Sequence, residues 1–267
     1  MKKILLRWIR WMGWMNGFDR AYFSWNRFRN AKKNRQFRKE NPQVKLPPDY
    51  MLYEAYRLDY AAYYQDGADT AAALVQQWKE HGMPGHARIL EWGCGPARII
   101  RHLPALLPSA DIYGTDYNSA TIGWCRRNIE GVNFDTNDLN PPLRYENNSF
   151  DVVYALSVFT HLSKKNHDEW MNELHRILRP GGLLLLTTQG QAFMVKLAPE
   201  ERQLFGSGAL VVRDHVQEGH RSYSAFQPEK YMHALFSNRW KVVKFAAGTP
   251  QSWGPEQDTW IVQKIKE

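Results

Sequence analysis

The sequence of 267 residues predicts an α/β protein with a doubly wound, seven-stranded, mostly parallel sheet and a helical N-terminal extension. From about residue 86 onward, short apolar runs alternate with segments that have a helical period. Nearly continuous apolar strands, such as 150–156, are typical of a parallel sheet that helices cover on both faces. A glycine turn that follows the first of these strands is the third indication.

The elements of this fold follow from the apolar pattern and from its interruptions. Strands are predicted over 88–92, 111–115, 132–135, 150–156, 183–188, 240–247 and 257–264. Helices are predicted over 50–65, 68–81, 97–107, 118–129, 166–178 and 228–237. Asp66-Gly67 separates the first two helices, and Pro180-Gly181-Gly182 ends the helix over 166–178. The last two strands predict an antiparallel hairpin at the edge of the sheet.

Composition excludes several classes of protein. With 43% hydrophobic residues the chain can bury a sizeable core, so it is not disordered throughout. Its two cysteines, Cys94 and Cys125, exclude a disulfide scaffold and a cysteine-rich zinc module. The histidines show no metal-ligand spacing with acids, so no metal site is predicted. No run of about 18 apolar residues predicts a membrane span, and a reduced, cytoplasmic compartment is expected.

Charge is concentrated at the N-terminus. Residues 1–46 contain 13 Lys and Arg against two acids, whereas the remaining chain has 22 basic and 25 acidic residues and a net charge of −3. Such an asymmetry indicates an arm that meets a polyanion. The sequence thus divides into a basic aromatic arm (1–46), a helical N-terminal lid (47–85) and a main domain (86–267), with Pro42, Pro47 and Pro48 near the first boundary.

Large apolar residues in the arm recur at steps of three or four and predict one face of a helix. They are Leu5, Trp8, Met12, Met15, Phe18, Tyr22 and Trp25. Arginines lie between them, which is the composition of an interfacial helix on anionic lipid, so residues 1–40 are expected to meet the inner face of a membrane peripherally. The alternatives are packing on the protein's own body, packing on a second subunit in a homo-oligomer, and stacking on single-stranded nucleic acid.

The first glycine turn is the most informative segment. A strand ends in Glu91-Trp92, and Gly93-Cys94-Gly95 then opens the next helix. Glycine allows a sharp turn and lets a ligand lie against the backbone. Asp116 ends the second strand, 21 residues after Gly95, where an acid faces the ribose of a nucleotide in a doubly wound sheet. A tight turn without a ligand is the structural alternative.

The type of ligand follows from what the turn lacks. A dinucleotide fingerprint needs Gly or Ala at position 98, where this chain has the bulky Arg98. No Gly-Lys-Ser/Thr sequence is present, which excludes a P-loop. A carboxylate at Glu91 disfavours a phosphate and suits a cationic ligand, such as an ammonium group.

With these motifs the chain resembles the class I S-adenosylmethionine-dependent methyltransferases. Glu91-x-Gly93-x-Gly95-x-Ala97 is similar to the first motif of that family, with Ala97 in place of the usual last glycine. Two further segments, 149–153 and 178–183, are similar to the family's fourth-strand motif and to its turn into the fifth strand. The resemblance is strong over about 86–190 and looser over 47–85 and 221–265, where Gln257-Asp258 before the last strand also fits. It implies a Rossmann-like methyltransferase fold and S-adenosylmethionine as cofactor.

The resemblance also implies a set of cofactor-binding residues. In the family an acid at Asp116 binds the ribose hydroxyls, and an acid after the third strand contacts the adenine amino group. Asp138 matches the second acid, with Asp135 as the competing candidate. The residues predicted to bind the cofactor are Glu91, Gly93, Cys94, Gly95, Arg98, Asp116, Tyr117, Asp138, Leu139 and Leu156.

One residue is predicted to be catalytic. His161 follows the fourth strand, in the loop at the carboxyl edge where the acceptor must lie, and is the candidate general base. Its alternative is a structural role in that loop. His215, His220 and Tyr223 lie in the irregular stretch 206–224, which is a candidate wall for the acceptor. Another group either packs or closes over the cofactor: Tyr53, Tyr60, Tyr63 and Tyr64.

The predicted reaction is O-methylation of a small molecule, a glycan or a lipid-linked intermediate. One alternative is N-methylation of a small amine or an RNA. Methylation of nucleic-acid bases is disfavoured because residues 155–159, Ala-Leu-Ser-Val-Phe, lack the Asn/Asp-Pro-Pro-aromatic signature. A non-catalytic binding module with this fold is the alternative from a different class, but such a module would have no need of Glu91, the glycines and Asp116.

Overall fold

The computed structural model describes residues 15–214, 216–220 and 222–265. The chain divides into two compact units, Met1–Ala68 and Asp69–Glu267, which are treated separately. Leu5, Trp8 and Met12 of the predicted arm lie outside the described residues. None of the helices in the described ranges is long and apolar enough to span a bilayer.

The first unit is helical. It contains α2 (Met15–Glu40), α3 (Asp49–Ala55) and a π-helical turn over Ala62–Asp66 that continues into α4 (Gly67–Glu80). The predicted break at Asp66-Gly67 is wrong, because the backbone stays helical there and the chain instead leaves the helix over 56–59. Tyr53, Tyr60 and Tyr63 are buried in this unit's own core with Phe37 and Leu52, and Tyr64 packs against that core.

The second unit is built on a seven-stranded sheet in the order β3-β2-β1-β4-β5-β11-β8. Its strands are β1 (Arg88–Trp92), β2 (Asp111–Asp116), β3 (Asn133–Thr136), β4 (Phe150–Ala155), β5 (Leu178–Thr188), β8 (Trp240–Ala246) and β11 (Asp258–Lys264). Strands β1 to β5 are parallel, and β11 runs antiparallel to both β5 and β8. The doubly wound, mostly parallel sheet with a late antiparallel pair is therefore confirmed.

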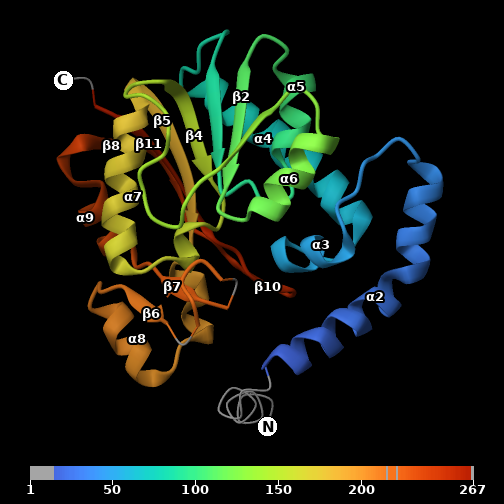
Figure 1. Cartoon of the computed structure of the whole chain (residues 1–267). Helices are drawn as coiled ribbons and strands as arrows, with labels where there is room; N and C mark the ends of the chain where they lie inside the picture. The colour runs from blue at the N-terminus through green and yellow to red at the C-terminus, as the bar shows by residue number, and fades with distance from the viewer. Residues whose placement is uncertain (1–14, 215, 221, 266–267) are drawn as a thin grey trace. The chain divides into compact units, whose positions relative to one another are not determined.

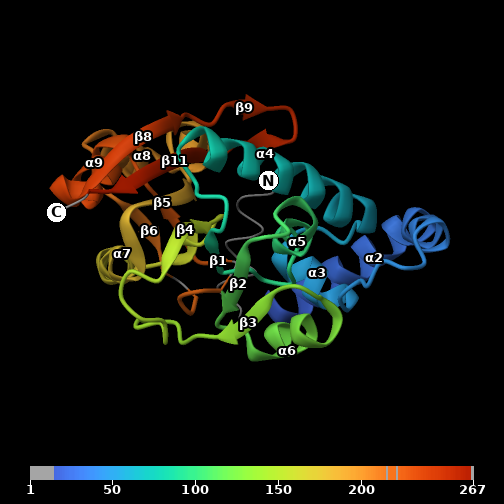
Figure 2. The ribbon, with the colours of Figure 1, turned by 90° about the horizontal axis from the view of Figure 1, so that it is seen from above.

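Helices cover both faces of this sheet, as Figure 2 shows with α4, α5 and α6 on one side and α7 and α9 on the other. The remaining bounds are α5 (Leu103–Leu106), α6 (Ser119–Asn128), α7 (Lys164–Ile177), α8 (Pro199–Gly206) and α9 (Glu229–Phe236). The helix predicted over 97–107 is wrong in its first half. A 3₁₀ turn over Ile100–His102 precedes the short α5, which has Pro104 in its first turn.

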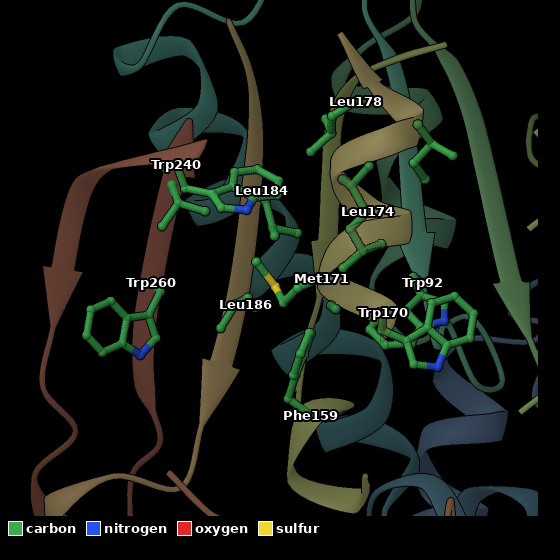
Figure 3. Close-up of a cluster of buried hydrophobic side chains, with 14 of the residues drawn as sticks. Trp92, Phe159, Trp170, Met171, Leu174, Leu178, Leu184, Leu186, Trp240 and Trp260 are labelled. Carbon is green, nitrogen blue, oxygen red and sulfur yellow. The ribbon is translucent and has the colours of Figure 1, made fainter. Parts of the chain in front are cut away.

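The main core lies between the sheet and α7. Trp92 at the end of β1 packs on Trp170 of α7, with ring centroids 4.3 Å apart, and meets Phe159 edge-on at 5.6 Å. Figure 3 shows these three rings together, with Met171 and Leu174 continuing the cluster along α7. Because Phe159 opens η3 (Phe159–His161), this packing sets the position of His161 after β4.

A smaller layer follows β5. It contains α8 and a two-stranded ribbon of β6 (Val211–Arg213) and β7 (Ser224–Phe226), which the sequence did not predict. Phe193, Phe205, Val211 and Phe226 form its core. In Figure 1 this layer lies below the main sheet, at the edge where the arrows of the parallel strands end. A second ribbon, β9 (Pro250–Gln251) with β10 (Gly254–Pro255), lies between β8 and β11 in the sequence and connects these paired strands.

Candidate functional site

The glycine turn after β1 is fastened to the end of β2. The backbone N–H groups of Gly93 and Cys94 both donate to the carbonyl of Thr115, at 2.8 and 3.0 Å. Gly93 has φ +77°, and a Cβ atom there would lie 2.4 Å from a methyl carbon of Val158. Only glycine therefore fits between this turn and the loop after β4.

Asp116, at the end of β2, accepts hydrogen bonds from two backbone N–H groups. One oxygen accepts from Gly95 at 2.9 Å and the other from Asn118 at 2.8 Å. Burial raises the pKa of this carboxyl, and the two hydrogen bonds act in the opposite sense. A carboxylate offers about four acceptor positions, so two stay available for ribose hydroxyls after these bonds are made.

Glu91 is a buried carboxyl group under the same turn. The Tyr154 hydroxyl donates to its Oε2 at 2.9 Å. Burial raises the pKa of Glu91 to about 8, although the Tyr154 hydrogen bond and the nearby charge of Arg98 lower it. A buried carboxyl that is costly to ionise is stabilised in its charged form by a cation beside it, which suits the ammonium group of a methionine moiety.

The two acids after β2 and β3 differ in what they contact. Asp135 is buried and forms ion pairs with Arg144 and Arg126, and it accepts a hydrogen bond from Tyr145 at 3.2 Å. Its oxygens are therefore occupied by the protein. Asp138 is exposed, and its carboxylate makes no hydrogen bond to the residues that the structure describes. Its adenine contact stays a prediction, with Asp138 the more available of the two.

Gly219, between β6 and β7, joins three of the predicted site residues. Tyr117 donates its hydroxyl to the Gly219 carbonyl at 3.1 Å, and the Gly219 N–H donates to the carbonyl of His161 at 3.0 Å. A Cβ atom on Gly219 would lie 2.8 Å from Leu139 and 3.7 Å from the Tyr117 ring. The segment over 216–220 thus lies across the carboxyl edge between the predicted cofactor residues and the predicted base.

Glu218 anchors this segment to the start of α7. Its carboxylate accepts from the backbone N–H of Ser163, which is the N-cap of α7, and from the Asn166 side chain at 2.9 Å. An acid at a helix N-terminus is stabilised there by the unpaired N–H groups and the helix dipole. The anchor connects residues more than 50 positions apart, and no local sequence signal marks it.

His161 is held in a defined orientation. Its Nδ1 lies 2.8 Å from the Tyr223 carbonyl oxygen, so Nδ1 carries the proton and Nε2 carries the lone pair. Nε2 has no hydrogen-bond partner among the described residues. Burial lowers the pKa of this imidazole, and His220 lowers it further, although the Tyr223 contact acts the other way. His161 is consequently neutral near pH 7, the form that a general base requires.

The loop after β4 is strained. Ser157 has φ +63°, a left-handed conformation that is uncommon for serine. The Ser157 N–H donates to the Thr187 hydroxyl at 2.8 Å, and the side-chain amide of Gln257 donates to the Ser157 hydroxyl at 2.8 Å. The ends of β4, β5 and β11 therefore hold this loop in place. Strained backbone of this kind is often found at functional sites. Leu156, between β4 and Ser157, is half-buried at this edge.

Cys94 and Cys125 are both buried, and each thiol donates to the carbonyl of Gly95, at 3.6 and 3.5 Å. Burial raises the pKa of both thiols, so neither is a thiolate at neutral pH. Their contacts with the Gly95 carbonyl support the glycine turn, which is a structural role.

Comparison with known proteins identifies the central part of the chain. Residues 89–182 match the family described as methyltransferase domain. The chain is 26% identical over 237 residues to a tRNA N(3)-cytidine methyltransferase of Danio rerio, over 82% of this chain and 64% of the relative. It is 36% identical over 102 residues to a fatty-acid O-methyltransferase of Mycolicibacterium smegmatis, over 38% of this chain and 36% of the relative. The chain thus spans less than two thirds of either relative.

Solved structures share the fold. An S-adenosylmethionine-dependent methyltransferase of Methanosarcina mazei superposes with a TM-score of 0.57 at 20% identity, over 73% of this chain and 98% of that one. A second similar structure, an amino pentose methyltransferase from Micromonospora echinaspora with S-adenosylmethionine bound, has a TM-score of 0.53 at 16% identity, over 74% of this chain and 92% of that one.

Residues 89–182 therefore form a methyltransferase domain with the fold of S-adenosylmethionine-dependent methyltransferases, whose cofactor is S-adenosylmethionine. The residues of this chain fit it. The bare backbone at Gly93 and Gly95, the buried Glu91 carboxyl and the available acceptor positions of Asp116 match a cofactor with an ammonium group and a ribose.

The site contains two residues that the sequence did not single out, Glu218 and Gly219, which act through contacts to distant segments. Gln257 also acts through such a contact, and the sequence had marked it as part of the pair before the last strand. Among the predicted residues, the structure brings Gly93, Cys94, Gly95 and Asp116 together in one turn, and Tyr117, Leu139 and His161 around Gly219. Their roles in binding and catalysis stay predictions.

Proposed function

We propose that this protein transfers a methyl group from S-adenosylmethionine to an oxygen atom of a small molecule, glycan or lipid-linked acceptor. The observation that carries the proposal is the orientation of His161, whose Nδ1–H is fixed on the Tyr223 carbonyl. A neutral imidazole with Nε2 available at the end of β4 is suited to take a proton from a hydroxyl group.

The residues of the glycine turn hold the cofactor in this proposal. Glu91 accepts from its ammonium group, Asp116 accepts from its ribose hydroxyls, and Gly93 to Gly95 allow close approach of the backbone. When bound, the cofactor supplies a methyl group that a sulfonium has already activated. Positioning of the two reactants is then the main task of the protein.

His161 completes the proton balance. As the acceptor oxygen forms its bond to carbon, the hydroxyl proton passes to Nε2 of His161, and the imidazolium later releases it to water. The carbonyl of Tyr223 stabilises the imidazolium because it accepts from Nδ1–H in both states. General base catalysis of this kind contributes roughly 10² to 10⁴-fold to the rate.

The choice of acceptor has two supports. Curated relatives with names that include fatty-acid O-methyltransferase and phthiotriol/phenolphthiotriol dimycocerosates methyltransferase are 36% identical to this chain over about 100 residues. In addition, a hydroxyl acceptor uses a base, whereas a neutral amine or an ionised carboxylate needs none. Trans-aconitate 2-methyltransferase, a further relative, favours small acids as the second group to test.

Methylation of tRNA is not favoured, although tRNA methyltransferases are among the relatives. Residues 47–267 have a net charge of −3, and binding to a nucleic acid depends on neutralising its phosphates. A basic channel across the methyltransferase unit is therefore not expected from its composition.

A transfer assay with radiolabelled S-adenosylmethionine tests the proposal. The acceptor panel contains hydroxylated and carboxylated lipids, glycolipids, small acids, small amines and unmodified tRNA. We expect ether-type products from the hydroxylated acceptors and base-labile esters from the carboxylated ones, with loss of ether formation in His161→Ala. Transfer only to amines or tRNA, with equal rates in His161→Ala, would overturn both the acceptor class and the base.

A further inference from the structure

Helix α2 has two different faces. Residues at positions 23, 26, 30, 34 and 37 follow helical spacing and are the buried or half-buried positions of the helix, on the face toward the core of the first unit. Phe37 is 4% exposed, and the buried Asn34 exchanges hydrogen bonds with the backbone of Leu58 and Tyr60 at 3.3 and 3.0 Å. This face is therefore already paired with the protein itself.

Ion pairs flank the buried face and fix the helix in place. Lys33 pairs with Asp59 at 2.6 Å, and Arg27 pairs with Asp49 at 3.1 Å. Arg38 donates to the Tyr60 hydroxyl at 2.8 Å, with its guanidinium over that ring. The buried face and its flanks thus have partners within the first unit. Helix α2 is packed as part of that unit by this face, and its other face is exposed.

The opposite face, which we call the aromatic–basic face, carries large aromatic rings at the surface. Its members recur at steps of three and four, apart from Phe28 beside them: Tyr22, Trp25, Phe28, Arg29, Lys32, Gln36 and Lys39. Phe28 is 84% exposed and Trp25 is 49% exposed. Exposing aromatic rings of this size to water costs free energy, and their grouping on one helix face marks an interaction surface.

The charges on this face are all of one sign. Arg29 lies over the Trp25 ring at 5.1 Å, and Lys32 and Lys39 follow along the same line. Across residues 20–39 the sequence contains eight Lys and Arg and no acid. The surface that covers this face must therefore be negatively charged and must also accept aromatic side chains, which is the chemistry of an anionic lipid headgroup layer.

The neighbouring sequence favours lipid over nucleic acid. Residues 4–9 are Ile-Leu-Leu-Arg-Trp-Ile, and two further tryptophans follow at 11 and 14. These residues lie outside the described ranges. Aliphatic side chains gain free energy in acyl chains and have no base-stacking surface, whereas tryptophan is typical of the headgroup region.

We propose that the aromatic–basic face of α2 docks the protein on the anionic surface of a lipid bilayer. Trp25 and Phe28 enter the headgroup layer, and Arg29, Lys32 and Lys39 contact lipid phosphates. The inference does not depend on the methyl acceptor, and it is measured without cofactor or acceptor, so its failure is distinct from a failure of the proposed function.

Vesicle sedimentation of the full chain tests the docking. Vesicles of phosphatidylcholine alone are compared with vesicles of phosphatidylcholine and phosphatidylglycerol. The variant Arg29→Gln/Lys32→Gln should weaken binding to the anionic vesicles about thirtyfold, because two charges are lost from the contact. The variant Trp25→Ala/Phe28→Ala should weaken it by about tenfold or more.

Matched controls lie in the second unit. Lys241→Gln/Lys244→Gln removes the same charge from β8, and Trp253→Ala removes an exposed tryptophan from the β9–β10 ribbon. Both should bind anionic vesicles as the wild type does. All variants should keep wild-type helix content by circular dichroism, because the changed side chains on α2 are exposed.

Three results would overturn the docking proposal. The first is equal vesicle binding by the α2 variants and the controls, and the second is equal binding of the wild type to neutral vesicles. The third is single-stranded RNA that binds the wild type more tightly than anionic vesicles and loses affinity in the α2 variants, since the face would then be a nucleic-acid surface.

Discussion

The two halves of the site are held together in different ways. The predicted cofactor half, at the ends of β1 and β2, depends on one turn, in which the Gly93 N–H donates to the Thr115 carbonyl and the Gly95 N–H donates to the Asp116 carboxylate. The acceptor half, after β4, depends on contacts between distant segments, such as His161 with Tyr223 and Ser163 with Glu218. Short turns suit the part of a site whose chemistry is the same throughout a family. Loops that are held by distant contacts can differ in sequence and length, so they suit the part that selects the acceptor.

Loss of His161 should have the largest effect, and it should fall only on the acceptor half. We expect His161→Ala to lower kcat by roughly 10² to 10⁴-fold, because the hydroxyl proton has no acceptor. The affinity for S-adenosylhomocysteine, measured by calorimetry, should stay at the wild-type value. His86→Ala, an exposed histidine before β1, is the matched control. An equal loss in both variants would remove His161 as the base.

Acid should weaken the support of the acceptor half. His167 is fully buried, its Nε2 donates to the Phe159 carbonyl at 2.8 Å, and burial lowers its pKa to about 4. Between pH 6.5 and pH 4 the unfolded chain binds a proton at this residue and the folded protein does not. The free energy of unfolding should therefore fall by about 3 kcal/mol as the pH drops through this window.

Urea unfolding of the wild type and of His167→Gln measures this contribution. Glutamine can keep a donor toward Phe159 and has no proton to gain. The difference in free energy of unfolding between the wild type and the variant should be constant above pH 6.5. Below pH 6.5 the wild type should lose stability relative to the variant. Parallel curves down to pH 4 would show that His167 is not the cause.

The predicted cofactor half should respond to pH closer to neutrality, through the ionisation of Glu91. With the pKa of Glu91 at about 8, the carboxyl is mostly protonated at pH 6 and cannot pair with an ammonium group. Binding then requires loss of a proton, so the Kd for S-adenosylhomocysteine should fall by about tenfold per pH unit between pH 6 and pH 7.5. Calorimetry in buffers of different ionisation enthalpy should report the released proton. A pH-independent Kd, or the same slope in Glu91→Gln, would contradict this role.

The smallest effect should come from the anchor of the 216–220 segment. Glu218→Ala removes the acceptor for Ser163 N–H and should lower the free energy of unfolding by about 1 kcal/mol, the usual cost of a lost cap. Glu218→Gln keeps an acceptor oxygen at this position, so its free energy of unfolding should lie between those of the wild type and Glu218→Ala. Chemical denaturation measures both variants, and equal stability of all three proteins would show that the anchor is not stabilising.

Sequence reasoning succeeded where local spacing carries the information. The strands β1 and β4, the doubly wound class of the sheet and the class of the domain follow from apolar runs and from the glycine turn. It failed over 97–107, where Pro104 and the turn geometry outweigh the helical period, and at Asp66-Gly67, where glycine is tolerated inside a helix. Propensity is a weak guide when tertiary contacts compete with it.

The missed site residues share a physical cause. Glu218 and Gly219 contact residues 52 to 102 positions away, so no short window of the sequence contains both partners. The arm shows a related limit: its period predicted the face with Tyr22 and Trp25 but not the second face, on which Phe37 is buried and Phe23 packs against the core. A helical period shows that a face exists, and the rest of the chain decides which face is buried.

The central claim is that the turn between β1 and β2 binds S-adenosylmethionine through Asp116. Calorimetry with S-adenosylmethionine on the wild type, Asp116→Ala and Asp111→Ala tests it most directly, because Asp111 is an exposed acid at the other end of the same strand. We expect Asp116→Ala to raise the Kd by about 100-fold, the equivalent of two lost charge-assisted hydrogen bonds, and Asp111→Ala to bind as the wild type. Equal affinity in Asp116→Ala and the wild type, or no binding by the wild type, would contradict the account.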